Sequence, residues 1–243
     1  MGTDNSAVRL TAILERVRDE NATDPALRAW MRVFDVPDYL GVLQGAADLG
    51  RLVDQLEADV LALPKDEDPE HLLSYLPLLR KLIETFAIVG KVSMVEFAKH
   101  AHVGVIYSVA SCARALRRNG RIEPLIADDS VKQLVNDVRA IIDDVIVSDL
   151  PESLKELLVD RLRDVEVSLL NVRIGGYASV EKAMDSLTFA AMRATEPDSG
   201  ERAQAGSFVA RLWGKLSEHA QGAEAIASTA ASTAEVVKAI TGS

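Results

Sequence analysis

Residues 49–63 read LGRLVDQLEADVLAL, and large aliphatic side chains recur in this stretch at intervals of three and four residues. An α-helix completes a turn every 3.6 residues or so, which places side chains at these intervals on one face. Asp38 precedes the pattern and is expected to cap the start of the helix. The stretch therefore predicts a long amphipathic helix, whose buried face consists of Leu49, Leu52, Val53, Leu56, Val60 and Leu63.

The same periodicity recurs along the chain, for example in residues 131–146 and 154–169, and no segment sustains the alternation of a β-strand. Hydrophobic residues make up 48% of the 243 positions and aromatic residues only 5%, a composition that suits helix-on-helix packing. The sequence predicts an all-α fold, a multi-helix bundle that ends in a C-terminal helical pair.

Several helix boundaries can be predicted from local chemistry. Asp–Pro pairs at 24–25 and 68–69 combine a capping residue with a proline that fits the first turn of a helix. Ser93 is expected to start a helix that continues to Arg118, and Asp149 is expected to cap the helix that follows Pro151. The glycines at 175–176 are expected to end that helix.

The stretch 195–202 contains Thr, Pro, Asp, Ser and Gly, residues that are typical of a loop. This composition predicts an all-α domain over residues 1–194, a linker over 195–202, and a C-terminal pair of amphipathic helices over 203–243.

The charge distribution disfavours nucleic acid as a partner. The formal net charge is −10, and residues 119–170 alone carry 12 acidic against 6 basic side chains. A protein that grips DNA or RNA needs a basic surface to displace counterions from the phosphates, and the sequence offers no such stripe.

The cellular setting predicted from the sequence is the cytoplasm. Cys112 is the single cysteine, so no disulfide can form within the chain. The first 20 residues follow an amphipathic pattern rather than that of a signal peptide, and no uncharged apolar stretch approaches the length of a membrane span.

Glu96 and His100 are the best candidates for a metal site, because residues four apart share one face of a helix. His102 would lie on another face of an unbroken helix, and zinc sites need three or four converging ligands. Two partly buried, hydrogen-bonded histidines are therefore the preferred interpretation. The sequence contains no motif for a cofactor or for catalysis, and we expect neither a cofactor nor an enzyme.

The C-terminal helices are the predicted interaction site. Small side chains in the last helix would allow another helix to approach closely. Three partners are compatible with this pattern: the chain itself, a second copy in a homo-oligomer, or a membrane surface contacted through Trp213 and its basic neighbours. The residues predicted to take part are Phe208, Leu212, Trp213 and Leu216 in the first helix, and Ile226, Ala230, Val237 and Ile240 in the second.

Residues 150–194, LPESLKELLVDRLRDVEVSLLNVRIGGYASVEKAMDSLTFAAMRA, resemble a segment of uncharacterised bacterial helical proteins. In that group a leucine-rich helix ends at an Ile-x-Gly turn, matched here by Ile174 and Gly176, and a short helix follows, matched by Val180 and Ala183. The resemblance implies a bacterial source and an all-α fold, and some members of the group look like parts of phage-defence loci.

Together these observations predict a non-enzymatic helical module for protein interaction or assembly. The alternatives are a membrane-acting effector in bacterial defence, such as defence against phages, and a helical metal-dependent enzyme.

Overall fold

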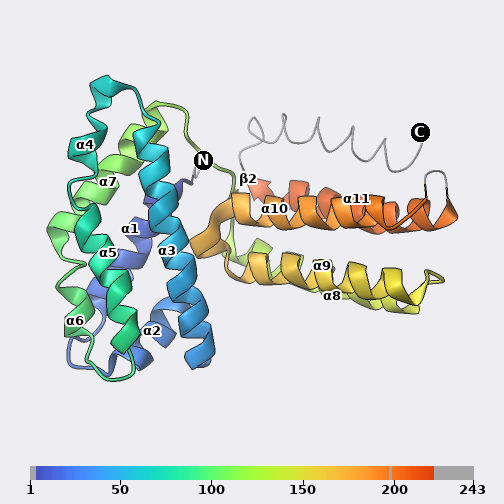
Figure 1. Cartoon of the computed structure of the whole chain (residues 1–243), viewed down its shortest axis with the longest axis horizontal. Coiled ribbons are helices and arrows are strands. Elements are labelled where there is room, and N and C mark those ends of the chain that lie inside the picture. Colours follow the sequence, from blue (N-terminus) through green and yellow to red (C-terminus); the bar gives the residue numbers. More distant parts are fainter. Residues whose placement is uncertain (1–3, 197–198, 222–243) are drawn as a thin grey trace. The chain divides into compact units, whose positions relative to one another are not determined.

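The computed structural model describes residues 4–196 and 199–221 and confirms the all-α fold (Figure 1). It contains two compact units: an N-terminal unit, Asp4–Ile122, and a C-terminal unit that begins at Glu123. Regular structure in the described residues is helical except for the two-residue strands β1 and β2.

The N-terminal unit consists of helices that alternate with short turns. The 23-residue helix α3 is the longest, and its predicted stripe from Leu49 to Leu63 is buried as expected. Asp38 caps α3 by accepting a hydrogen bond from the backbone N–H of Gly41 at 2.8 Å. The elements are α1 (Ser6–Asp19), α2 (Ala26–Phe34), α3 (Tyr39–Leu61), η1 (Lys65–Glu67), α4 (Pro69–Leu72), α5 (Leu76–Glu84), η2 (Thr85–Ile88), α6 (Val95–Ala98) and α7 (Val103–Arg118).

The core of this unit lies between α3 and the helices that pack on it, α1, α2 and α5, while α1 also packs along α7. An aromatic cluster occupies one part of the core. The ring of Trp30, which is fully buried, lies 4.7 Å from Phe34, 4.5 Å from Phe86 and 5.2 Å from Phe97 between centroids. Although aromatic residues are scarce in the chain, four of them gather at this point.

The C-terminal unit is a four-helix arrangement in which α8 packs on α9, α9 on α10, α10 on α11 and α11 back on α8. The helices enclose a single apolar core with residues from all four. Strands β1 and β2 pair in antiparallel fashion, with Leu125 opposite Gln221, and so connect the start of the unit to the segment that follows α11. The elements are β1 (Leu125–Ile126), α8 (Asp128–Val147), α9 (Glu152–Leu170), α10 (Val172–Arg193), α11 (Gly200–His219) and β2 (Ala220–Gln221).

The chain divides at a different place from the predicted one. The boundary between the compact units falls at 122/123, within the stretch predicted to be one domain. The predicted linker instead joins α10 to α11, two helices that pack on each other within one core. The turn between two packed helices and a linker between two domains have the same loop-forming composition. Composition alone therefore could not tell that this segment lies inside a unit.

Four predicted helix boundaries also differ from the structure. At the start of α2, Pro25 rather than Asp24 occupies the position before the helix, without a side-chain cap. The helix expected over 93–118 is broken between α6 and α7, and His102 caps α7 instead. Pro151 rather than Asp149 occupies the position before α9, without a side-chain cap. The helix expected to end at Gly175–Gly176 already ends at Leu170, and Gly176 interrupts the following helix α10 with φ 69° and ψ −177°.

Candidate interaction surface

Among the described residues, those of the predicted metal site do not belong to any set of three potential ligands. Glu96 lies on α6 and pairs with Lys99, while His100 lies after the end of that helix. His102 accepts a hydrogen bond from the backbone N–H of Gly104 through Nδ1 at 3.2 Å, so it serves as a helix cap. Within the described residues no three potential ligands converge, and Glu96 and His100 lack the partners that a metal site needs.

His100 is half-buried, and its Nδ1 has no hydrogen-bond partner among the described residues. Burial lowers the pKa of His100, and the positive charges of Lys99 and Lys81 lower it further. The imidazole is therefore neutral at pH 7. The predicted hydrogen bond to this histidine is not present at Nδ1.

Cys112 has the properties of a core residue. It is buried, and burial raises the pKa of its thiol to about 11. A nucleophilic cysteine needs a thiolate, which this environment disfavours.

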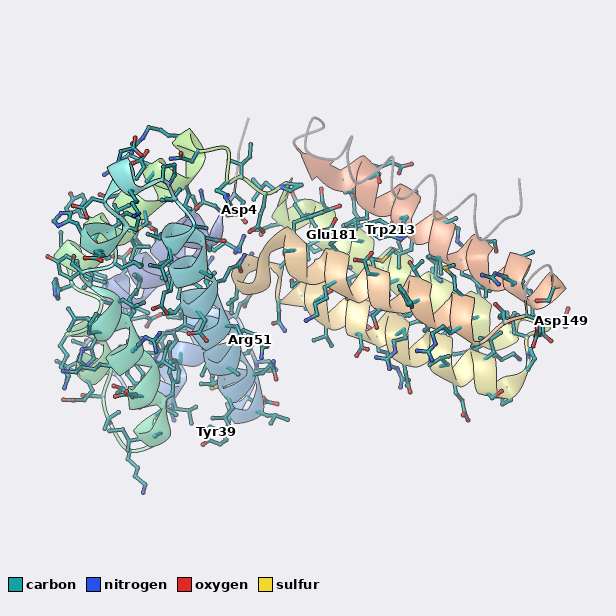
Figure 2. The ribbon with its side chains drawn as sticks, turned by 45° about the horizontal axis from the view of Figure 1, so that its top comes forward. Asp4, Tyr39, Arg51, Asp149, Glu181 and Trp213 are labelled. Atoms are coloured by element: carbon teal, nitrogen blue, oxygen red, sulfur yellow. The ribbon has the colours of Figure 1, made fainter. Side chains whose placement is uncertain are left out.

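The first predicted interaction helix, α11, turns its large apolar residues into the core of its own unit. Leu212, Trp213 and Leu216 are each at most 5% exposed. Trp213, labelled in Figure 2, donates a hydrogen bond from Nε1 to Oγ1 of Thr188 on α10 at 3.3 Å. Phe208 is half-buried against the same core. These residues therefore stabilise the C-terminal unit and leave little apolar surface for a partner.

Ile226, Ala230, Val237 and Ile240, the predicted interaction residues of the last helix, lie outside the described residues.

An unpartnered helix face is instead found on α3, opposite its buried stripe. Leu40 is 74% exposed and Leu61 58% exposed, although both are large apolar residues at the two ends of the helix. Exposed positions recur between them at alternating steps of four and three, as in the seam of a coiled coil. We call this set the α3 outward face, and it consists of Leu40, Gln44, Ala47, Arg51, Asp54, Ala58 and Leu61.

Two further apolar residues border the first turns of this face. Tyr39 is 52% exposed and Leu43 39% exposed, so they widen the apolar surface around Leu40. Figure 2 labels Tyr39 near one end of α3 and Arg51 farther along the same helix. The α3 outward face is thus apolar toward its ends and charged in the middle.

The charged middle of the α3 outward face is anchored from within the unit. Arg51 pairs with the carboxylate of Asp48, whose side chain is buried, while the Arg51 side chain itself is 67% exposed. Gln44 donates a hydrogen bond to the same carboxylate at 3.3 Å. Asp54 is exposed and forms no ion pair with any residue that the structure describes. The face therefore presents one cation held in position and, one turn away, one anion without a partner in the described part of the chain.

The C-terminal unit also has a groove on its surface, of about 390 Å³. One pair of its charges is compensated locally, since Lys155 pairs with Glu152 at 3.8 Å. The apolar residues Ile146 and Val159 contribute only part of the lining, so the groove lacks the apolar character of a typical small-molecule site. It is lined by Ile146, Glu152, Lys155, Glu156, Val159, Asp160 and Arg163.

Comparisons with protein-family models, with curated proteins and with solved structures find no match for the chain. Among the helices of residues 4–196 and 199–221, none is long and apolar enough to cross a membrane.

The α3 outward face was not predicted from the sequence. Its signal was present, because Leu40, Leu43 and Leu61 are large apolar residues that lie off the predicted core stripe of the same helix. Only the positions of the neighbouring helices show that these residues remain uncovered.

Proposed function

We propose that the protein is a non-enzymatic helical module that binds another protein through the α3 outward face. The observation that supports this proposal is the exposure of large apolar residues at both ends of a 23-residue helix that is otherwise well packed. Exposed apolar groups on a rigid helix are typical of helix-mediated recognition, in which a partner helix covers them.

The remaining features of the described residues agree with a binding role. Glu96, a predicted metal ligand, pairs with Lys99, no three potential ligands converge among the described residues, and the single cysteine is buried as a neutral thiol. The α3 outward face, by contrast, combines an apolar surface with charges that can select a partner.

A photo-crosslinking amino acid placed at Ala47 would test the proposal in cells that make the protein. Ala47 lies within the α3 outward face and is exposed. The matched control is Ala12, an exposed alanine on helix α1 of the same unit. We expect crosslinked products at position 47 that position 12 does not give. Equal or absent products at the two positions would contradict the proposal.

The C-terminal segment is the second surface that we propose for assembly, since Ile226, Ala230, Val237 and Ile240 share one predicted helix face. Deletion of residues 223–243 should lower the oligomeric mass measured by light scattering and preserve the helical circular dichroism of the rest of the chain. An unchanged mass would exclude a role of this segment in joining chains.

The membrane-acting alternative, with its implied setting in bacterial defence, has less support. Trp213 would be the membrane anchor, but it is only 5% exposed and is bonded to Thr188. The alternative predicts that the protein sediments with anionic liposomes, and that Trp213→Glu abolishes sedimentation. Intact protein that stays in the supernatant would exclude it.

A further inference from the structure

We infer that the partner of the α3 outward face is a second copy of this chain, with the two α3 helices antiparallel around a twofold axis. This inference rests on the proposed function and names the partner of the same surface. It is carried by the order of charged and apolar residues along the face.

The charges of the face complement themselves only in the antiparallel arrangement. The twofold axis crosses the outward face at the level of Leu52 and Val53 along the helix. Arg51 then lies opposite Asp54 of the second copy, and the symmetry repeats this pair. In a parallel pair in register, Arg51 would face Arg51 and Asp54 would face Asp54. Like charges in contact disfavour that arrangement, so the two Arg–Asp pairs select the antiparallel one.

The residues on either side of the charged pair fit the same axis. Ala47 lies opposite Ala58 of the second copy, and these small side chains allow the two helix backbones to approach closely. Gln44 lies opposite Leu61, and Leu40, one turn farther out, lies opposite Lys65, so that Leu40 and Leu61 of the two copies contact each other diagonally at both ends of the pair. The alternating spacing of four and three keeps all these positions on the contact line.

The contact of Arg51 with Asp48 within the chain is compatible with this dimer. A guanidinium group carries five N–H donors, and the Arg51 side chain is 67% exposed while it holds Asp48. Donors therefore remain for Asp54 of the second copy, and Asp48 fixes the direction from which they approach.

The pair should be weak and dependent on concentration. One helix face from each copy covers less surface than a standard stable interface, which buries roughly 1,600 Å² in total. The apolar contribution comes mainly from Leu40, Leu43 and Leu61, and the centre of the interface is charged. High salt should weaken the association, because the central pairs remain close to solvent.

Charge reversal tests the arrangement with the full-length chain. In sedimentation velocity over a concentration series, the unaltered protein should shift from monomer to dimer. Arg51→Glu and Asp54→Arg should each weaken the association about tenfold or more, because each places like charges opposite each other at two symmetric contacts. An equimolar mixture of the two variants should recover the association, since every central contact then joins opposite charges.

The mixture separates the proposed contact from a loss of folding. Damage to the fold would lower association in the mixture as much as in either variant alone. Arg28→Glu, which reverses an exposed charge on α2, is the matched control and should associate as the unaltered chain does. A monomer at all concentrations, variants that associate normally, or a mixture without recovery would overturn the inference. If the chain stays monomeric while position 47 crosslinks to a different protein, the proposed function stands. Only the inference that the partner is a second copy of this chain is then wrong.

Discussion

Glu181 is a half-buried carboxylate on α10 whose charged form the C-terminal unit disfavours. Burial raises its pKa, and the negative charges of Asp185 and Glu123 raise it further. The same surroundings raise the pKa of the buried Tyr177 to about 12. The folded unit therefore loses stability when Glu181 ionises.

Glu181→Gln should stabilise the protein at neutral pH, because it removes a charge that the folded state holds less favourably than the unfolded chain does. The folded-state pKa lies above the unfolded value of about 4.5, so the unfavourable contribution is complete above the folded pKa and absent below the unfolded one. Thermal melts should show a higher Tm for the variant at pH 7 and a difference that vanishes near pH 4. A difference independent of pH would contradict this account, and Glu156→Gln, at an exposed position, is the control.

Two glycines of the C-terminal unit should respond to alanine in opposite directions. Gly176 has φ 69° and ψ −177°, a conformation that alanine adopts only with strain, and Gly176→Ala should cost about 1–3 kcal/mol. Gly214 lies within α11 with open space around its Cα, and Gly214→Ala should stabilise by about 0.5–1 kcal/mol. Urea unfolding measures both changes, and a shift of the two variants in the same direction would be inconsistent with the structure.

At the scale of elements, α11 belongs to the core of the C-terminal unit because of its large apolar residues. Trp213→Ala should lower the free energy of unfolding by about 3–5 kcal/mol, since it leaves a cavity next to α10. Trp213→Phe keeps most of the volume and loses the hydrogen bond to Thr188, so its cost should be clearly smaller. Equal and small effects of both changes in urea unfolding would show that α11 does not pack as described.

Helices were predictable wherever their own sequence determines them. The stripe on α3 and the capping role of Asp38 follow from spacing and local chemistry, and both are confirmed. The turn at which α6 starts was not predictable, because distant backbone groups hold it in place. Met94 donates its N–H to the carbonyl of Asp24 at 2.9 Å, and Val95 donates to that of Ala22 at 2.9 Å.

The periodicity of the sequence also could not predict which apolar helix face remains exposed. The apolar stripes of α3 and α11 look alike in sequence, yet the stripe of α11 closes a four-helix core within its own chain. Exposure of Leu40 and Leu61 depends on where α1, α2 and α5 pack, and these positions result from contacts that are distant in sequence.

At the scale of the whole molecule, each unit has its own buried residues, and we expect two thermal transitions in calorimetry. Trp213→Ala should lower the transition of the C-terminal unit. Trp30→Ala should lower that of the N-terminal unit, because it removes the centre of the aromatic cluster. A single transition that both substitutions shift equally would show that the units unfold together.

The packing of α1 along α7 has a consequence for synthesis on the ribosome. The Nδ2 group of Asn5 donates to the carbonyl of Ala113 at 3.4 Å, so the first and last helices of the N-terminal unit meet across more than a hundred residues. The side of α1 that packs on α7 thus has to wait for most of the unit to be translated, although α2 and α3 cover other parts of α1 earlier. The side of α1 that faces α7 is therefore open to water until α7 emerges, and a chaperone that binds the nascent chain would find it exposed.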